Sequence, residues 1–417
     1  MTKLRLTTAY RQCPTRSNAI WRQHSLTDTK ADSGITHQPK TTVRIGIIGP
    51  SWWVKFWHLP ALQAHPNAVI TAVCGANQRD PAELSALYGA QAQGWTDYEK
   101  MLDEASLDGV IICTPNDLHY PAAIAALRRG IHVICEKPVA MNAAQALEMA
   151  RTASEKGLLG MTNFPYRDNP AVQALRQKVV DGYLGTPLHI AGDYHGGFGL
   201  NGPPGWRGTT SRSGAGILAD LGSHLIDLVR FITQDEFASV CAHTLTLLRN
   251  PISPSTPTLH RTEDPQTGDR NDDSCAFLAE FASGAQGVFH TSWVAYQGAE
   301  AQQQSIEIFG TGGRLHFLAD HTGTLLRGKR TSETHWQEFD IEGTVSPCAG
   351  QENEDIFRPG RLTPTNTTYR WIEGIRTGQT DVTPDLTDGW HAQQVIDAVL
   401  QASRERRWIQ IEMHSKL

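Results

Sequence analysis

The strongest constraint on the fold is a regular alternation of short apolar runs with helix-like segments between residues 42 and 165. The runs are rich in β-branched residues, and the clearest helical segment, 143–156, has apolar residues at spacings of three and four. Strands are expected at 43–49, 69–75, 109–114 and 132–135, and helices at 81–88, 98–103, 121–129 and 143–156. Strands that alternate with helices at this pitch form βαβ units, so the pattern predicts a doubly wound parallel sheet of the Rossmann type.

The regular alternation of strands with helices ends at about residue 165. Two helices, expected at 168–182 and 215–233, flank a glycine-rich stretch, and alternating runs without intervening helices follow. Strands are expected at 188–194, 239–247, 274–282, 285–292, 305–310 and 314–317, then a helix at 390–405 and a short strand at 408–411. Such runs favour antiparallel pairing. The fold class is therefore α/β, with an N-terminal Rossmann sheet and a C-terminal α/β domain whose sheet is mostly antiparallel.

Charge and composition exclude several classes of partner. The 417 residues carry 37 Lys and Arg against 43 Asp and Glu, a net charge of −6, so there is no basic excess for nucleic acid or an anionic membrane. No apolar run approaches the roughly 18 residues that a membrane helix needs. We therefore expect a soluble globular protein with neither a nucleic-acid nor a membrane partner.

The cysteines indicate a reducing compartment. All seven are far apart, and none forms a Cys-x-x-Cys pair. This spacing argues against a zinc ribbon, a redox dithiol and a disulfide framework, so we expect free structural thiols and no metal. A cytoplasmic location is consistent with this usage.

Residues 1–40 differ from the rest of the chain. They contain seven basic and two acidic residues and many Ser and Thr, with no sustained periodicity. This composition is compatible with a mitochondrial transit peptide, which would make the location mitochondrial. The interpretation that we favour is a disordered extension at 1–41, or an upstream start codon that is not used.

The first strand-to-helix turn, residues 49–54, reads GPSWWV. A dinucleotide pyrophosphate binds at this position of a Rossmann sheet, against the N-terminal amides of the helix. Of the three glycines in the Gly-x-Gly-x-x-Gly pattern only Gly49 is present, because Ser51 and Val54 replace the others. Ser51 is small enough to let a phosphate approach, and its hydroxyl can donate to a phosphate oxygen. Trp52 and Trp53 either pack under the sheet or shape the site.

The end of the second strand bears on the choice between NAD and NADP. An NAD site usually has an Asp or Glu there for the ribose 2′-hydroxyl, whereas an Arg suits a 2′-phosphate. No acidic residue lies at 75–77, where Asn77 stands, and Arg79 follows closely. We expect Asn77 and Arg79 to contact the cofactor, with a preference for NADP unless Arg79 is only a solvated charge at a helix start.

Two later segments carry groups suited to proton transfer. Residues 136–138, Glu-Lys-Pro, end a predicted parallel strand at the sheet edge where ligands bind. A partly desolvated lysine there can polarise a substrate hydroxyl or share its proton. Asp220 and His224 are four residues apart on a predicted helix and so share one face. A carboxylate that pairs with an imidazole orients it and raises its basicity, as a general base requires.

In combination, these motifs resemble the glucose-fructose oxidoreductase / inositol dehydrogenase (Gfo/Idh/MocA) family from about residue 43 to residue 411. The matching elements are Thr114-Pro115-Asn116 with His119, Gly130-x-His132-Val133 before Glu136-Lys137-Pro138, Trp206-Arg207, Gly216-x3-Asp220-x-Gly222-x-His224-x2-Asp227, residues 306–313, and Asp388-Gly389-Trp390. The resemblance implies an NAD(P)-binding Rossmann domain at 42–165. It also implies a C-terminal substrate and oligomerisation domain at 166–417 with an open sheet. The altered glycine turn departs from the family pattern.

The resemblance assigns roles to the matching positions. Lys137, Asp220 and His224 would be the catalytic residues, with His224 as proton acceptor and Lys137 contacting both the substrate hydroxyl and the nicotinamide ribose. Glu136 would hold that ribose, and Lys137-Pro138 is a candidate cis bond. The other expected cofactor contacts are Gly49, Ser51, Trp52, Thr114, Pro115, Asn116, His119, Trp206 and Arg207, and the expected substrate-side residues are Tyr166 and Arg167.

The expected activity is hydride transfer between NAD(P) and a secondary alcohol or ketone of a sugar, polyol or related small molecule. Two other functions stay open: nucleotide sensing without turnover, and glycoside cleavage by transient oxidation and elimination with tightly held NAD. The presence of all three catalytic residues favours the dehydrogenase over the sensor. Accumulation of reduced cofactor separates the dehydrogenase from the eliminating glycosidase. The family habit also implies a homo-oligomer, either a dimer or a tetramer.

Overall fold

The computed structural model describes residues 39–75, 88, 92–201, 205–247, 270–295, 302–320, 323–341 and 366–412. The chain divides into two compact units, Met1–His37 and Gln38–Leu417, and all of the described residues belong to the second unit. The expected helix at 81–88 lies outside the described residues except for Tyr88, and so do Asn77 and Arg79. Among the described helices, none is both long and apolar enough to cross a membrane.

A six-stranded parallel sheet occupies the first half of the second unit, as the alternation of strands and helices predicts. Its strands lie in the order β3-β2-β1-β4-β5-β6, and every neighbouring pair is parallel. They are β1 (Val43–Ile48), β2 (Ala68–Cys74), β3 (Gln93–Trp95), β4 (Gly109–Ile112), β5 (His132–Glu136) and β6 (Gly160–Asn163). The order reverses at β1, so the carboxyl ends of β1 and β4 flank the switch point where doubly wound sheets bind ligands.

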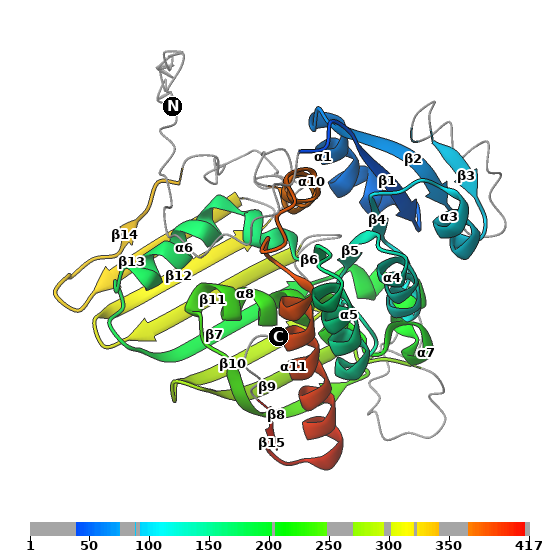
Figure 1. Ribbon diagram of the computed structural model, residues 1–417. Coiled ribbons are helices and arrows are strands. Elements are labelled where there is room, and N and C mark those ends of the chain that lie inside the picture. The colour runs from blue at the N-terminus through cyan, green and yellow to red at the C-terminus, as the bar shows by residue number, and fades with distance from the viewer. Residues whose placement is uncertain are drawn as a thin grey trace, which may run out of the picture. The chain divides into compact units, whose positions relative to one another are not determined.

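Helices cover both faces of this sheet (Figure 1). One face packs against α3 (Tyr98–Glu104), α4 (His119–Arg128) and α5 (Ala143–Glu155). The other packs against α1 (Leu59–Ala64) and α10 (Thr367–Thr377). Because both faces are buried, β1 and β4 are almost continuously apolar.

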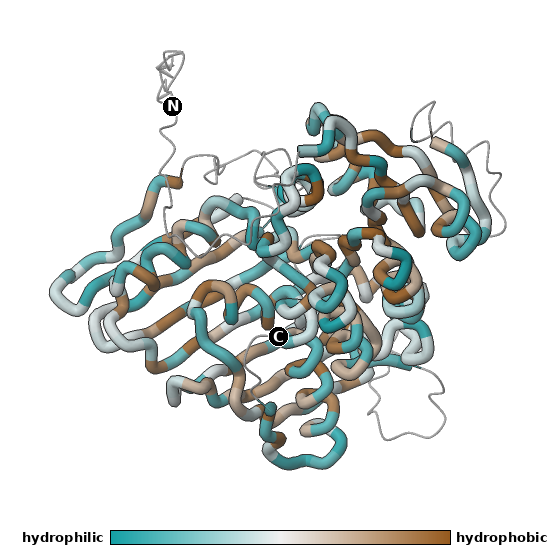
Figure 2. Tube along the Cα trace, in the orientation of Figure 1, coloured by the Kyte–Doolittle hydropathy of each residue, from teal (hydrophilic) through white to brown (hydrophobic). Residues whose placement is uncertain are grey.

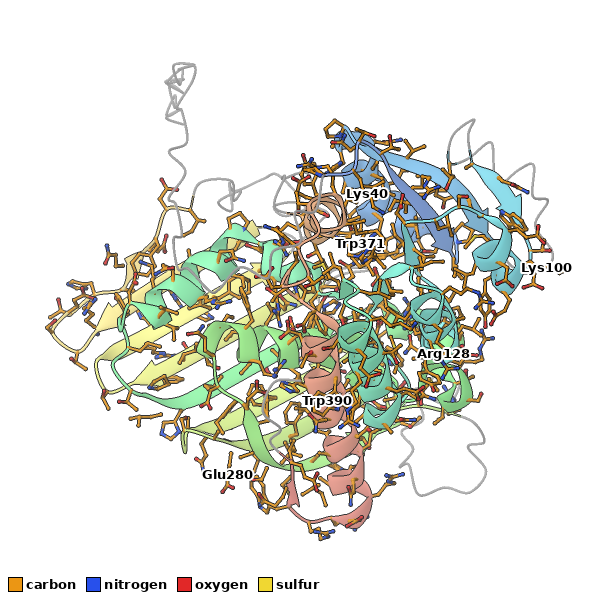
Figure 3. All side chains as sticks on the ribbon, viewed as in Figure 1. Lys40, Lys100, Arg128, Glu280, Trp371 and Trp390 are labelled. Carbon is orange, nitrogen blue, oxygen red and sulfur yellow. The ribbon has the colours of Figure 1, made fainter. Side chains whose placement is uncertain are left out.

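The helix α10 belongs to the core of the Rossmann sheet although it lies near the end of the chain. Trp371 is fully buried and packs in the same cluster as Ile45 and Ile111. A Cβ placed on Gly109 would lie 2.7 Å from the Trp371 ring, so the strand approaches the helix closely (Figure 3). A boundary at residue 165 therefore separates the two sheets in sequence, but residues from both sides of this boundary form the core of the Rossmann sheet.

The second sheet has nine strands in the order β14-β13-β12-β11-β7-β10-β9-β8-β15. All pairs are antiparallel except β7 with β10, which confirms the predicted mostly antiparallel, open sheet. The strands are β7 (Pro187–Gly196), β8 (Phe237–Leu245), β9 (Ser274–Phe281), β10 (Gln286–Ser292), β11 (Gln302–Gly310), β12 (Gly313–Asp320), β13 (Gly323–Arg330), β14 (Gln337–Glu338) and β15 (Ile409–Gln410).

One face of the nine-stranded sheet packs against three helices (Figure 1). These are α6 (Pro170–Val180), α8 (Ser223–Thr233) and α11 (Leu386–Glu405). Brown, hydrophobic segments in Figure 2 lie mostly within strands and helices, whereas the loop after α11 is hydrophilic. Short helical turns complete the described fold: η1 (Val54–His58), η2 (Asn116–Leu118), η3 (Pro165–Asp168), η4 (Phe198–Asn201), η5 (Gly205–Gly208), α7 (Thr210–Ser213) and η6 (Leu218–Gly222).

Candidate active site

Lys137 follows the last residue of β5, at the carboxyl edge of the Rossmann sheet, and the Lys137-Pro138 peptide is cis as expected. Its ammonium nitrogen Nζ lies 2.9 Å from Oδ1 of Asp220 and donates to the Asp220 backbone oxygen at 2.7 Å. The guanidinium Nε of Arg207 lies 3.4 Å from the other carboxylate oxygen, Oδ2. Burial opposes ionisation of Asp220, but Lys137 and Arg207 outweigh it and hold the pKa of Asp220 below its usual range.

The helix that carries Asp220 and His224 contains a wider π turn, η6, immediately before α8. In such a turn the hydrogen bonds run from residue i to i+5. The Asp220 carboxylate contacts Lys137 and Arg207, and among the described residues no hydrogen bond joins it to His224, although its charge raises the pKa of His224. Sequence spacing alone gives no sign of a π turn.

His224 is buried, with 4% of its surface exposed. Its Nδ1 atom has no hydrogen-bond partner among the described residues. Its ring lies edge-on to Tyr166, with 4.7 Å between the ring centroids. Burial first, and the charge of Lys137 second, hold the pKa of His224 well below 6.5. His224 is therefore a neutral imidazole with an unused nitrogen beside the Lys137–Asp220 pair.

Two tyrosines line the side of His224. Tyr166 lies in η3 and hydrogen-bonds through its hydroxyl to the hydroxyl of Tyr194 on β7. Tyr194 in turn donates to Oε1 of Gln302 at 2.5 Å, and its ring centroid lies 6.2 Å from that of His224. The sequence analysis did not identify Tyr194 as a site residue. The one feature that marks it is its position in an alternating strand, on the same face as other buried residues.

Arg167 does not join this group, although we expected it on the substrate side. Its guanidinium Nε donates to Asp227 at 2.9 Å, and Nη1 donates to Asp388 at 3.1 Å. These bonds tie η3 to α8 and α11 in a buried ion-pair cluster. The structure thus gives Arg167 a role in holding the helices together.

Gly49 makes the tight turn after β1. Its φ of +84° is in the left-handed region that favours glycine, and an added Cβ would lie 2.4 Å from the backbone oxygen of Cys113. The Ser51 hydroxyl oxygen accepts from the amide of Val54 at 3.3 Å and lies 3.1 Å from the Cys113 sulfur. The turn therefore requires glycine at position 49. The contacts of Ser51 with Val54 and Cys113 stabilise the turn.

The two tryptophans after this turn have different surroundings. Trp52 is 66% exposed. Trp53 donates from Nε1 to Oε1 of Glu136 at 2.7 Å and stacks on the buried Trp57. Trp53 thus contacts the site through Glu136, whereas Trp57, on which it stacks, is fully buried.

Glu136 is the centre of a buried hydrogen-bond network. Besides Trp53, its Oε1 contacts Nε2 of His58 at 2.8 Å and accepts from Nδ2 of Asn163 at 2.6 Å. Nδ1 of His58 lies 2.8 Å from the Thr368 hydroxyl on α10. Burial opposes ionisation of Glu136, but these bonds and the nearby Lys137 hold its pKa below the usual value. His58, Asn163 and Thr368 belong to no sequence motif that we used.

The loop after β4 holds the remaining expected cofactor contacts. The Thr114 hydroxyl is buried without a hydrogen-bond partner among the described residues, and Pro115 immediately precedes η2. Asn116 is buried, and its Nδ2 donates to the Ser213 backbone oxygen at 3.0 Å. Both ring nitrogens of His119 face backbone oxygens, of Thr114 at 2.9 Å and Pro138 at 2.8 Å. His119 therefore joins two loops of the site and has no free nitrogen for a cofactor.

Trp206 and Arg207 reach the site from η5. The Arg207 guanidinium carbon lies 4.4 Å from the Trp206 ring centre, and Arg207 pairs with Asp220 as described. Both side chains are half-buried. Arg207 thus places one cation of the C-terminal half next to the Asp220 carboxylate, with the Trp206 ring packed against it.

The residues at this sheet edge fit a bound dinucleotide. The close approach at Gly49 leaves no room for a side chain at the turn where a pyrophosphate binds in a Rossmann sheet. The unpartnered Thr114 hydroxyl offers a further polar contact, and Glu136 and Lys137 would hold the nicotinamide ribose. The site thus combines residues that can hold a nucleotide with the ammonium of Lys137 and the neutral imidazole of His224.

Comparisons with known proteins agree with this arrangement. A family model of oxidoreductases with an NAD-binding Rossmann fold matches residues 43–164. A model of the GFO/IDH/MocA C-terminal domain matches residues 172–316. Together these matches include all three catalytic candidates.

Individual relatives agree with the family models. Levoglucosan dehydrogenase of Pseudarthrobacter phenanthrenivorans is 28% identical over 85% of this chain and 92% of its own length. Inositol 2-dehydrogenase of Rhizobium meliloti is 29% identical over 89% of this chain and 99% of its own. The crystal structure of an oxidoreductase domain protein from Kribbella flavida superposes with a TM-score of 0.74 at 28% identity, covering 90% of this chain and all of that one. The chain is therefore an enzyme of the Gfo/Idh/MocA oxidoreductase family, with an NAD-binding Rossmann fold joined to that family's C-terminal domain.

Proposed function

We propose that the enzyme transfers a hydride between the nicotinamide of NAD(P) and a secondary alcohol or ketone of a sugar, polyol or related small molecule. The observation that carries the proposal is the Lys137–Asp220 ion pair, at 2.9 Å, beside the buried and unpartnered Nδ1 of His224. Relatives named levoglucosan dehydrogenase and inositol 2-dehydrogenase support the substrate class.

Each of the three residues has a defined task in alcohol oxidation. Neutral His224 accepts the hydroxyl proton, because its depressed pKa keeps the acceptor form populated at neutral pH. Lys137 donates a hydrogen bond to the substrate oxygen as negative charge develops there. Asp220 holds Lys137 in place, a different task from the orientation of His224 that we expected. The nicotinamide, when bound, supplies the hydride acceptor.

The substrate class is tested by screening polyols, anhydrosugars and glycosides with NAD⁺ and NADP⁺ and following absorbance of the reduced cofactor. Accumulation of one reduced cofactor per oxidised substrate supports the dehydrogenase. Glycoside cleavage without net reduction would favour the eliminating glycosidase. Cofactor binding with no turnover on any compound would favour a nucleotide sensor.

Within the NAD-binding family, we propose a preference for NADP in this chain. The support is the sequence at the end of β2, which has Asn77 and Arg79 and no acidic residue at 75–77. The test is a titration with NADPH and NADH that follows tryptophan fluorescence, which Trp52 and Trp53 should report. Tighter NADPH binding that is lost in Arg79→Ala supports the proposal. Preference for NADH in both proteins would show that Arg79 is a bystander.

We further propose a cytoplasmic homo-oligomer, a dimer or tetramer. The support is the exposure of Leu278 and Val288 on β9 and β10, at 46% and 59%. Size-exclusion chromatography with light scattering tests the assembly, and a monomer at micromolar concentration would overturn it. Localisation of a C-terminal fluorescent fusion tests the compartment, with a mitochondrial signal as the contrary result.

A further inference from the structure

Strand β7 presents two different groups on its two faces. Tyr194 faces the helices and contacts His224, as described above. Side chains alternate along a strand, so the neighbours Asp193 and His195 point to the opposite face of the nine-stranded sheet. His290 on the adjacent strand β10 is in register with Asp193. Three potential metal ligands therefore meet on the face that the helices leave uncovered.

Their atoms are close enough to share one ion. Nε2 of His195 lies 2.7 Å from Nδ1 of His290 and 4.0 Å from Oδ1 of Asp193. One ligand atom from each of the three residues lies within 4.8 Å of the other two. Within the described part of the chain, no other group of three His, Cys, Asp or Glu side chains meets this condition.

The rings are held in an orientation suited to a metal. Nε2 of His290 lies 3.0 Å from the Ser274 hydroxyl, which leaves Nδ1 facing His195. Histidine ligands in metal sites commonly use their second nitrogen in this way, because the outer hydrogen bond fixes the ring.

We propose that Asp193, His195 and His290 form a binding site for a zinc-class divalent cation. Two imidazole nitrogens and one carboxylate oxygen are the ligand set that borderline metals such as Zn²⁺ prefer over Mg²⁺ or Ca²⁺. Three protein ligands leave at least one coordination position for water. We expected no metal, because that expectation depended on cysteine spacing, whereas these histidines are 95 residues apart and meet only through strand pairing.

The site accommodates an ion with a small movement. Two imidazole nitrogens on a tetrahedral Zn²⁺ lie about 3.3 Å apart, so the rings must separate slightly from their present hydrogen bond. The Asp193 side chain is 50% exposed and can turn toward the ion. Bonds from the three side chains to the ion would replace the present hydrogen bond between His195 and His290.

This cation has no direct part in the reaction. Asp193 and His195 lie on the face of β7 opposite Tyr194 and His224, and the sheet backbone separates the two sites. The ion thus contacts neither substrate nor cofactor. Its presence is measurable without any assay of activity, and the result is independent of the proposed function.

The test is a Zn²⁺ titration of the full, untagged chain after chelator treatment, at pH 7.5 and in competition with a chromophoric zinc chelator. Co²⁺ is added in a parallel titration, because tetrahedral cobalt gives a visible absorption band. The variants are His195→Ala, His290→Ala and Asp193→Asn. His189→Ala is the matched control, because His189 lies on the same strand and face but outside the cluster. Thermal melting of the metal-free variants confirms that they fold.

We expect one Zn²⁺ per wild-type chain and a Co²⁺ band. Either histidine variant should weaken Zn²⁺ binding at least about 100-fold and abolish the band, and Asp193→Asn should weaken binding about tenfold. His189→Ala should match the wild type. Absence of Zn²⁺ binding by the folded wild type, or equal affinity in wild type and both histidine variants, would overturn the proposal. Equal weakening in His189→Ala would do the same, because it would indicate diffuse surface binding.

Discussion

The ammonium of Lys137 lies 2.9 Å from the carboxylate of Asp220, although the two residues are 83 positions apart. The contact joins the end of β5 to the π turn before α8, so it forms only when the two sheets are assembled. Both side chains are mostly buried, at 12% and 15% exposure. The ion pair fixes the position of the ammonium near His224, as the proposed reaction needs.

Replacing Asp220 by Asn tests the positioning of Lys137. The amide keeps the size of the carboxylate but removes its charge, which leaves the buried ammonium without full compensation. We expect turnover to fall about 100-fold or more and the free energy of unfolding to fall by about 1–3 kcal/mol. Steady-state kinetics and urea denaturation measure the two effects. Asp103→Asn is the control, because it removes a carboxylate from an exposed ion pair with Arg129 and should change both values little.

Replacing His224 by Gln tests its depressed pKa. In the unfolded chain the pKa returns to about 6.5, so below that pH the unfolded state binds a proton that the folded state does not. Above pH 6.5 the wild type therefore keeps the full stabilising effect of a neutral His224. Below pH 6.5 its free energy of unfolding falls by up to about 1.4 kcal/mol per pH unit. Urea unfolding between pH 7.5 and 5.5 should show a shallower loss in His224→Gln. An unchanged slope in His224→Gln would contradict the burial argument.

Gly49 and Gly130 form a matched pair for testing the nucleotide turn. Both have positive φ, at +84° and +77°, so alanine costs about 1–2 kcal/mol of backbone strain at either position. Only at Gly49 would the added Cβ collide with backbone, because nothing lies within 4 Å of it at Gly130. We expect Gly49→Ala to lose more stability than Gly130→Ala and to weaken NADH binding at least tenfold. Fluorescence titration measures the NADH affinity, and urea midpoints measure the stability. Equal NADH affinity in the two variants would count against a cofactor role for the turn.

Tyr166→Phe tests the substrate side of the site. The variant removes the hydroxyl that bonds to Tyr194 but keeps the ring against His224. We expect KM to rise about tenfold with kcat within about threefold, because binding is lost equally in the ground and transition states. Tyr183→Phe is the control, since that buried hydroxyl has no partner among the described residues. A change in stability with no change in KM would assign Tyr166 to packing alone.

Local sequence predicted most of the fold. The alternation in residues 42–165 is a local pattern, and it identified β1, β2, β4 and β5 in the correct parallel arrangement. It missed α10, whose burial of Trp371 depends on contacts with strands more than 200 residues earlier in the chain. Short strands such as β3 and β6 carry too few residues for a periodicity to show.

The site was predictable only where a motif marks it. Lys137 and His224 stand in recognisable patterns, and the structure brings them to one place with Asp220. The contact of Asp220 with Lys137 was not predictable from local sequence, because it joins residues 83 positions apart. Hydrogen bonds between residues far apart in the sequence could not be predicted either. One example is the contact of His58 with Thr368.

In the proposed reaction, Lys137 acts on the substrate oxygen during hydride transfer. The most direct measurement compares Lys137→Ala with wild type, using turnover on the best substrate from the screen and the Kd for NADH. Lys100→Ala, which removes an exposed lysine on α3, is the control (Figure 3). We expect Lys137→Ala to turn over about 1,000-fold more slowly while its Kd for NADH changes less than about tenfold. Turnover within a few fold of wild type in Lys137→Ala would contradict it.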